Sequence, residues 1–228
     1  KNTNKLIDKK KKFIELVKQY LKENVNTAAK LETFPKLVEI IDNLNLKKNR
    51  NSDTKVNSKN YYNYGNLVEV FTLIGGLGKI DLAPSLYLNV KKKSNKKYIV
   101  IHTSSNESDR NWNSLGWNSI IDKLVNDKNM IVYELGFQKQ YNKQSPFFVD
   151  FTGQKSLDEI ATLIANSHFF IGVDSAFAHL ANVYSVNSLI LLGSYRDFKS
   201  YMPYSGYFKK NENEVIYRFD GLLSNLES

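Results

Sequence analysis

Three side chains with useful chemistry lie close together in the segment GVDSAFAHLA, residues 172–181. Asp174 and Ser175 stand where an apolar run gives way to a helical pattern, and His179 follows Ser175 by one helical turn. Amides at a helix start point outward with the positive end of the helix dipole, so those of Ala176 and its neighbours form a ready site for a diphosphate. A plain structural role is equally open, with Asp174 or Ser175 as an N-cap and His179 as a half-buried helix residue.

A second polar segment, HTSSNESDRNW, covers residues 102–112. Thr103 and Ser104 bring small hydroxyl groups to the end of an apolar run, and Arg110 adds a cation. Hydroxyls and amides at a strand end can hold phosphate oxygens, and a guanidinium can add a charge-assisted or bidentate contact. Taken alone, the segment fits a polar surface loop with Trp112 packed into the core better than it fits a phosphate site.

The elements that would position these side chains follow from the apolar pattern after residue 97. Six short apolar runs are separated, for the most part, by amphipathic helical stretches. The runs cover 98–102, 130–136, 147–151, 168–173, 188–193 and 214–219, and the helical stretches cover 114–126, 156–166 and 175–184. Continuous apolar runs are typical of strands buried on both faces, so we predict an α/β fold with a doubly wound, parallel, Rossmann-like sheet. Ligands of such sheets bind beyond the carboxyl ends of the strands, which is where both polar segments begin.

The first 97 residues differ from the rest in charge and pattern. They hold 21 Lys and Arg against 9 Asp and Glu, whereas residues 98–228 hold 11 against 14. Apolar residues spaced three and four apart predict two helices before residue 45 and a third at 67–73, which the glycines of 75–78 end. We therefore expect three parts: a basic helical hairpin with a polar linker over 1–60, a connecting helix and loop over 61–97, and a Rossmann-like domain over 98–228 that carries both polar segments.

Two lysine runs, 9–12 and 91–97, lie at the edges of segments. Contact with water alone is the commonest outcome for such runs. An anionic membrane surface comes next, because an amphipathic helix adjoins the first run. Nucleic acid comes last, since no base-reading motif accompanies the lysines, and no specific nucleic-acid partner is expected.

The composition argues against several other kinds of site. The 228 residues include no Cys, so disulfides, Cys-ligated zinc, iron–sulfur clusters and a thiol nucleophile are excluded. The three His residues are scattered, which argues against a His-based metal site, although carboxylates can still hold Mg²⁺. No apolar run approaches the roughly 18 to 20 residues of a membrane span. The chain begins with Lys1 and no signal-peptide pattern follows, which suggests a fragment or a processed chain.

Taken together, the segments resemble the C-terminal half of glycosyltransferase family 9, the heptosyltransferases of bacterial lipopolysaccharide synthesis, which have the GT-B fold. Four features carry the resemblance, which covers about residues 66–200. They are a cation two residues before a Trp (Arg110 and Trp112), the TG-x-x-SL segment from Thr152 to Leu157, the D-S-x-x-x-H helix start, and a small-residue helix leading to a strand that ends at Gly193.

The resemblance implies that the cleft side of the sheet holds a nucleotide-sugar donor, with an ADP-linked sugar as one candidate. The residues assigned to the donor diphosphate and sugar are Asp174, Ser175, Ala176, His179, Arg110, Thr103 and Ser104. The residues assigned to the nucleoside are Gly136, Gly153, Ser156 and Leu157. Such enzymes transfer the sugar with inversion and need no metal and no cofactor beyond the donor. Amides, the helix dipole and cations meet the charge of the leaving diphosphate.

Three departures from the family pattern bear on function. Ala176 replaces the usual Gly, which adds a methyl group where the backbone approaches phosphate. Arg110 stands where Lys is common, which keeps the charge and changes the geometry. The family's N-terminal Rossmann-like half, which carries the Asp taken as general base, has no counterpart in these 228 residues. No catalytic residue is therefore assigned.

Two functions are favoured by the sequence over a third, a basic protein that binds nucleic acid or a membrane surface on a Rossmann-like scaffold. The first is a heptosyltransferase-like glycosyltransferase in which this chain supplies the donor-binding half and the acceptor is a cell-envelope glycan, a lipid-linked glycan or another molecule. We expect a cytoplasmic protein, with peripheral contact at the inner membrane through the Lys-rich N-terminal region. The second is a non-catalytic module of the same descent that binds a nucleotide or docks a partner.

Overall fold

A computed structural model of the protein describes residues 56, 59–74, 81, 83–86, 88, 90–91, 98–128 and 130–226. The chain divides into two compact units, residues 1–55 with 73–78 and residues 56–72 with 79–228. The expected helical hairpin, most of the expected linker and both lysine runs, apart from Lys91, lie outside the described residues. Within the ranges that the structure covers, no helix has the length and apolar character needed to cross a membrane.

The second unit is built on a sheet of six parallel strands in the order β3-β2-β1-β4-β5-β6. The strands are β1 (Tyr98–His102), β2 (Ile131–Leu135), β3 (Phe148–Asp150), β4 (Phe169–Val173), β5 (Ser188–Leu192) and β6 (Ile216–Arg218). Each strand lies within one of the six apolar runs. The predicted α/β fold with a doubly wound parallel sheet is confirmed.

The longer described helices match the amphipathic stretches of the sequence. They are α4 (Leu67–Ile74), α5 (Ser114–Asp122), α6 (Leu157–Ala165) and α7 (Ala176–Val183), and a π-helical turn, η3 (Lys123–Asp127), continues α5. Shorter helices are α8 (Gly206–Lys210), α9 (Glu212–Val215), η1 (Tyr61–Asn63), η2 (Ser108–Arg110), η4 (Tyr195–Asp197) and η5 (Leu223–Asn225). The predicted helix over 67–73 is confirmed as α4.

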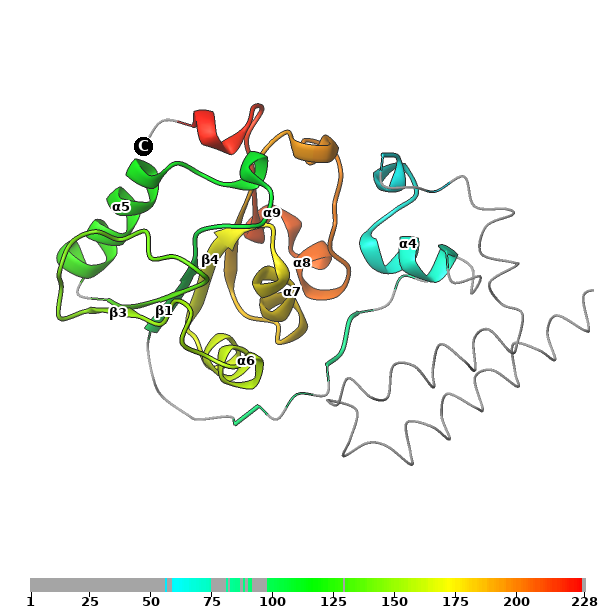
Figure 1. Ribbon diagram of the computed structural model, residues 1–228. Helices are drawn as coiled ribbons and strands as arrows, with labels where there is room; N and C mark the ends of the chain where they lie inside the picture. The colour runs from blue at the N-terminus through cyan, green and yellow to red at the C-terminus, as the bar shows by residue number, and fades with distance from the viewer. Residues whose placement is uncertain are drawn as a thin grey trace, which may run out of the picture. The chain divides into compact units, whose positions relative to one another are not determined.

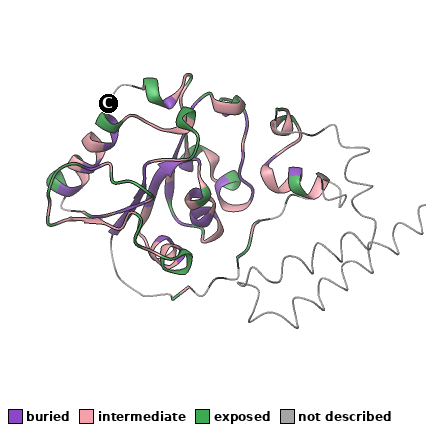
Figure 2. Ribbon diagram, viewed as in Figure 1, coloured by how far each residue is buried: buried purple, intermediate pink, exposed green. Residues whose placement is uncertain are grey.

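Apolar side chains from both faces of the sheet form two cores. Figure 1 shows α5 on one side of the strands and α6 and α7 on the other. Tyr98 and Val100 of β1 point to the face covered by α6, α7, α8 and α9, and Ile99 and Ile101 point to the face covered by α5. The alternation follows from the two-residue period of a strand. Figure 2 shows that the central strands β1, β4 and β5 are mostly buried, whereas the helices carry intermediate and exposed residues, as expected for a sheet between two helical layers.

The order of the strands brings the two polar segments of the sequence together. β1 and β4 are neighbours, and His102 at the end of β1 pairs in register with Gly172 of β4. The approach is close, because a Cβ atom on Gly172 would lie 3.0 Å from the carbonyl oxygen of His102. The chain leaves β1 and β4 in the same direction, so the loops that follow them share one edge of the sheet.

Candidate functional site

Helix α7 begins directly beyond the end of β4. Ser175 is its N-cap, and its hydroxyl oxygen accepts a hydrogen bond from the amide of Ala178 at 3.4 Å. Ala176, the first helical residue, is exposed. The positive end of the helix dipole is thus accessible to solvent, and Ser175 fills the plain capping role.

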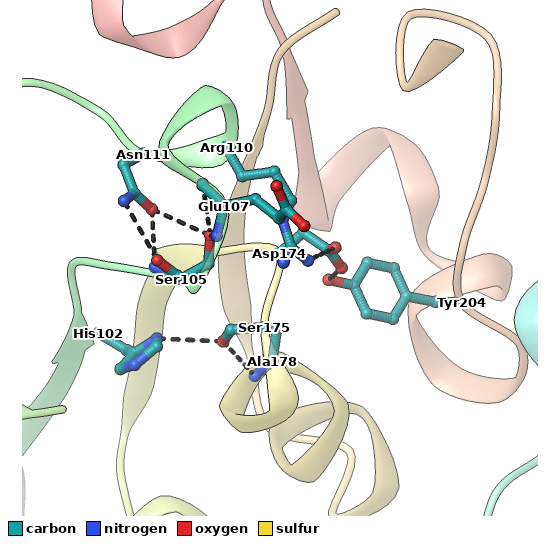
Figure 3. A network of polar contacts seen from close by, with 9 residues as sticks. All are labelled: His102, Ser105, Glu107, Arg110, Asn111, Asp174, Ser175, Ala178 and Tyr204. Carbon is teal, nitrogen blue, oxygen red and sulfur yellow. Dashed lines mark hydrogen bonds and ion pairs between the residues drawn. The ribbon is translucent and has the colours of Figure 1, made fainter. Parts of the chain in front are cut away.

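Asp174 joins the two polar segments (Figure 3). Its Oδ2 lies 2.9 Å from Nη1 of Arg110, which comes from the loop after β1, and its Oδ1 accepts the hydroxyl of Tyr204 at 2.6 Å. Only 6% of Asp174 is exposed. A charge-assisted bond on each oxygen stabilises the buried carboxylate.

Local hydrogen bonds close the loop that carries Arg110. The amide of Ser105 donates to the side-chain oxygen of Asn111 at 2.7 Å, and the hydroxyl of Ser105 donates to the carbonyl of Glu107 at 2.9 Å (Figure 3). The guanidinium also lies 5.4 Å from the centre of the Tyr195 ring, within the range of a cation–π contact. Arg110 therefore has a defined position before any ligand arrives.

The buried imidazole of His102 lies next to the start of α7. Its Nδ1 lies 3.0 Å from the hydroxyl oxygen of Ser175, and its ring contacts that of Phe177 with the centroids 4.4 Å apart. Burial lowers the pKa of His102 to about 4, so the ring is neutral at pH 7. A neutral Nδ1 can accept the Ser175 proton, which leaves the Ser175 oxygen to cap α7.

His179 lies one turn into α7 and is half-buried. Its ring packs on that of Tyr204 with the centroids 4.7 Å apart. Burial lowers its pKa, the charge of Asp174 raises it, and Arg110 lowers it, with burial the largest of the three effects. At neutral pH the ring is an uncharged group that can donate or accept a hydrogen bond.

A cavity of about 590 Å³ opens over these residues. Its volume is in the range of small-molecule and cofactor sites. Its lining includes six of the assigned residues: Ser104, Arg110, Asp174, Ser175, Ala176 and His179. The described lining also includes Tyr61, Leu67, His102, Ser105, Asn106, Phe137, Phe177, Phe198 and Pro203.

Thr103 has a different position from the other assigned residues of its loop. It is 2% exposed, and its hydroxyl lies 3.3 Å from Oε1 of Glu134. Glu134 also accepts the amides of Gln140 at 2.8 Å and Tyr141 at 3.3 Å, and burial raises its pKa. Thr103 is outside the described lining of the cavity and helps to fasten the loop after β2 to the end of β1.

Of the four residues assigned to the nucleoside, Gly136 follows β2, Gly153 follows β3, and Ser156 and Leu157 form the start of α6. The amide of Gly153 donates to the carbonyl of Gly136 at 2.8 Å, and both residues have positive φ, +67° and +140°. Ser156 is the N-cap of α6, and Leu157 is 56% exposed. All four are outside the described lining of the cavity. From the loop after β2, the described lining includes Phe137, which is 85% exposed.

Several residues of the site belong to no motif in the sequence. His102 is the last residue of an apolar run, so its position predicts a strand residue. A histidine at the carboxyl end of a predicted strand is the signal that could have marked it as a site residue. Tyr204 and Tyr61 lie in segments without a motif, and only the fold brings them to Asp174 and to the cavity. Trp112 packs on Trp117 of the core, as the structural alternative for its loop predicted, while Arg110 faces the cavity.

Titratable side chains of the site do not form a metal-binding cluster. Across the described residues, no group of three or more His, Asp and Glu side chains is placed to hold a metal ion.

Comparison with known proteins agrees with the fold and the motifs. The family model of glycosyltransferase family 9 (heptosyltransferase) matches residues 76–205. The structure of ADP-heptose LPS heptosyltransferase II from E. coli is similar over 73% of this chain and 56% of that chain, with 17% identity and a TM-score of 0.53. A glycosyltransferase family 9 protein from Veillonella parvula is similar over 73% of this chain and 51% of that chain, with 14% identity and a TM-score of 0.53.

No sequence match was found among curated proteins. The chain spans between 40% and 56% of the length of the solved structures that it resembles. The family model covers more than half of the chain, and the six-stranded parallel sheet has the arrangement of the GT-B heptosyltransferases. The chain therefore belongs to glycosyltransferase family 9, the heptosyltransferase family.

Proposed function

We propose that the cavity binds the nucleotide diphosphate of a nucleotide-sugar and that the chain supplies the donor-binding half of a heptosyltransferase-like enzyme. One observation carries the proposal: Arg110, the start of α7 and His179 line a single cavity at the carboxyl ends of β1 and β4. An ADP-linked heptose is the favoured donor, because the E. coli relative is described as an ADP-heptose heptosyltransferase. The acceptor would be a glycan of the cell envelope or a lipid-linked glycan.

The charges of the site suit a diphosphate. The exposed start of α7 offers backbone amides and the positive end of a dipole. Arg110 has five N–H donors, and only Nη1 is directed to Asp174 in the described contacts, so the guanidinium retains donors for phosphate oxygens. Asp174 balances the charge of Arg110, and its negative charge is directed to Arg110 and Tyr204.

In the proposed reaction an acceptor hydroxyl attacks the anomeric carbon, and the bond from that carbon to the diphosphate oxygen breaks with inversion. The leaving diphosphate gains negative charge as the bond breaks. Amides at the start of α7 and the guanidinium of Arg110 would stabilise that charge, which is the task a metal ion performs in other transferases. His179 is placed to hold a sugar hydroxyl or a phosphate oxygen. The group that takes the acceptor proton is not assigned.

Calorimetric titration with ADP, UDP, GDP and AMP tests the proposal. We expect ADP to bind more tightly than AMP, because only a diphosphate reaches both the start of α7 and Arg110. Arg110→Ala should weaken ADP binding by about tenfold or more, the loss typical of a charged hydrogen bond. The control Lys128→Ala removes an exposed positive charge before β2, at the opposite edge of the sheet, and should leave the affinity unchanged.

The outcomes separate the two functions that the sequence left open. Failure of every nucleotide to bind at millimolar concentration would overturn the proposed site. Nucleotide binding by a full-length protein that transfers no sugar from ADP-heptose to any acceptor glycan would favour the non-catalytic module.

The cellular setting is a separate proposal that rests on charge. Residues 1–97 carry 21 Lys and Arg against 9 Asp and Glu, so we propose a cytoplasmic protein that contacts the anionic inner membrane through this region. Salt-sensitive binding to vesicles of anionic lipid, and weaker binding to duplex DNA of equal charge concentration, is the expected result. Equal binding to both would indicate non-specific electrostatics alone.

A further inference from the structure

Tyr204 contacts two residues of the proposed donor site, Asp174 and His179. Its side chain is completely buried, between η4 and α8. Its hydroxyl donates to Oδ1 of Asp174 at 2.6 Å, the distance typical of a charge-assisted bond from a hydroxyl to a carboxylate, and its ring packs on His179. Tyr204 is outside the described lining of the cavity, so it contacts two lining residues without facing the ligand.

Asp174 has little capacity left for a ligand. Tyr204 occupies one carboxylate oxygen and Arg110 the other, and 6% of the residue is exposed. A free carboxylate would repel a diphosphate, whereas a carboxylate bound on both oxygens holds the guanidinium in place. Asp174 therefore acts on the diphosphate through Arg110, and the orientation of Asp174 is set from the opposite side by Tyr204.

The backbone around Tyr204 is fixed to the same helix that presents the site. Asn182 of α7, 2% exposed, donates from Nδ2 to the carbonyl of Ser205 at 2.8 Å and accepts the amide of Phe208 at 2.8 Å. The ring of Phe208 also meets the edge of Tyr204, with the centroids 5.2 Å apart. These contacts hold the Tyr204 hydroxyl in a constant position relative to the start of α7.

We propose that Tyr204 is a positioning residue for the donor diphosphate, acting through Asp174 on Arg110 and through its ring on His179. This inference rests on the proposed donor site. Without the Tyr204 hydroxyl, one oxygen of a buried carboxylate lacks its partner. The carboxylate is then free to turn toward the cavity, where it repels the diphosphate and no longer holds Arg110 in place.

The chain offers a matched control in Tyr201, three residues earlier. Tyr201 is 5% exposed, and its hydroxyl is buried without a hydrogen-bond partner in the part of the chain that the structure describes. Tyr204→Phe and Tyr201→Phe each remove one buried phenolic oxygen and keep the ring. Only the first removes a bond to the donor site.

The experiment measures the affinities of ADP and adenosine for wild type and for both variants, together with the melting temperatures. We expect Tyr204→Phe to raise the Kd for ADP about tenfold, the effect of losing one hydrogen bond to a charged group, and to leave the Kd for adenosine unchanged. Tyr201→Phe should change neither Kd. A purely structural role of Tyr204 would lower the melting temperature and leave the ratio of the ADP and adenosine affinities unchanged, which would overturn the inference.

A double-mutant cycle tests the path through Asp174. If Tyr204 acts through Asp174, Tyr204→Phe combined with Asp174→Asn should bind ADP no more weakly than Asp174→Asn alone. Additive losses would contradict this path. Wild type that binds no ADP would overturn the donor site and the inference together, whereas wild type that binds ADP with Tyr204→Phe unaffected would overturn the inference alone.

Discussion

At the scale of single residues, the burial of His102 predicts how the free energy of unfolding depends on pH. The pKa of His102 falls from its ordinary 6.5 to about 4 in the folded protein, because burial disfavours the charged ring. Between pH 6.5 and 4 the unfolded chain binds a proton that the folded chain does not. The contribution of His102 to the free energy of unfolding is therefore complete above pH 6.5 and is lost as the pH falls toward 4, by about 3 kcal/mol in total.

Urea unfolding of wild type and His102→Asn at a series of pH values between 7.5 and 4 measures this contribution. Wild type should be the more stable protein at pH 7.5, and the difference between the two free energies should shrink as the pH falls. A difference that stays constant across this range would contradict the predicted titration of His102.

The residues of the site divide into those that a sequence can reveal and those that it cannot. Asp174, Ser175 and His179 lie within six consecutive residues at the start of one helix, so spacing alone places them together. Arg110 joins them only because β1 and β4 are neighbours. This adjacency is predictable from the strand order of a doubly wound sheet. The contact between Tyr204 and Asp174 depends on the path of a loop between two short helices, and no periodicity encodes that path.

At the scale of elements, the sequence predicts the sheet well because buried parallel strands are continuous apolar runs. It says less about residues 193–215, where α8 and α9 have only five and four residues. Helices this short have little stability of their own and form only because neighbouring elements hold them. Asn182 provides such support for α8 by accepting the amide of Phe208.

The start of α6 offers a prediction that separates capping from ligand binding. The Ser156 hydroxyl accepts the Glu159 amide at 3.4 Å, and the Ser156 amide donates to Oε2 of Glu159 at 2.9 Å, which completes a capping box. We expect Ser156→Ala to lower the stability by about 1 kcal/mol, seen as a lower melting temperature, without weakening ADP binding. Ser156→Thr, which keeps a hydroxyl, is the control. Weaker ADP binding with unchanged stability would instead support the predicted contact of the Ser156 side chain with the nucleoside.

At the scale of the whole molecule, the basic charge and the cavity belong to different stretches of sequence. Residues 1–97, with 21 Lys and Arg against 9 Asp and Glu, carry +12 of formal charge, whereas residues 98–228, which contribute most of the cavity lining, hold 11 against 14 and carry −3. Overall charge in this second stretch cannot attract an anionic donor. Any affinity for a diphosphate must therefore come from local groups, chiefly the start of α7 and Arg110.

A local site of this kind predicts how the folded protein responds to ligand and to metal. A ligand that binds only the folded state at 100 times its Kd adds about 2.7 kcal/mol to the free energy of unfolding, so ADP should raise the melting temperature by about 5 to 10 °C. Because the protein itself supplies the positive charge, we expect the same rise with excess EDTA as with Mg²⁺ at about 1 mM. Thermal scans of wild type with ADP under both conditions make the measurement, and Arg110→Ala, which at the same ADP concentration should lose about half of the rise or more, is the control. A rise that occurs only with Mg²⁺ would mean that a metal ion carries the charge assigned here to α7 and Arg110.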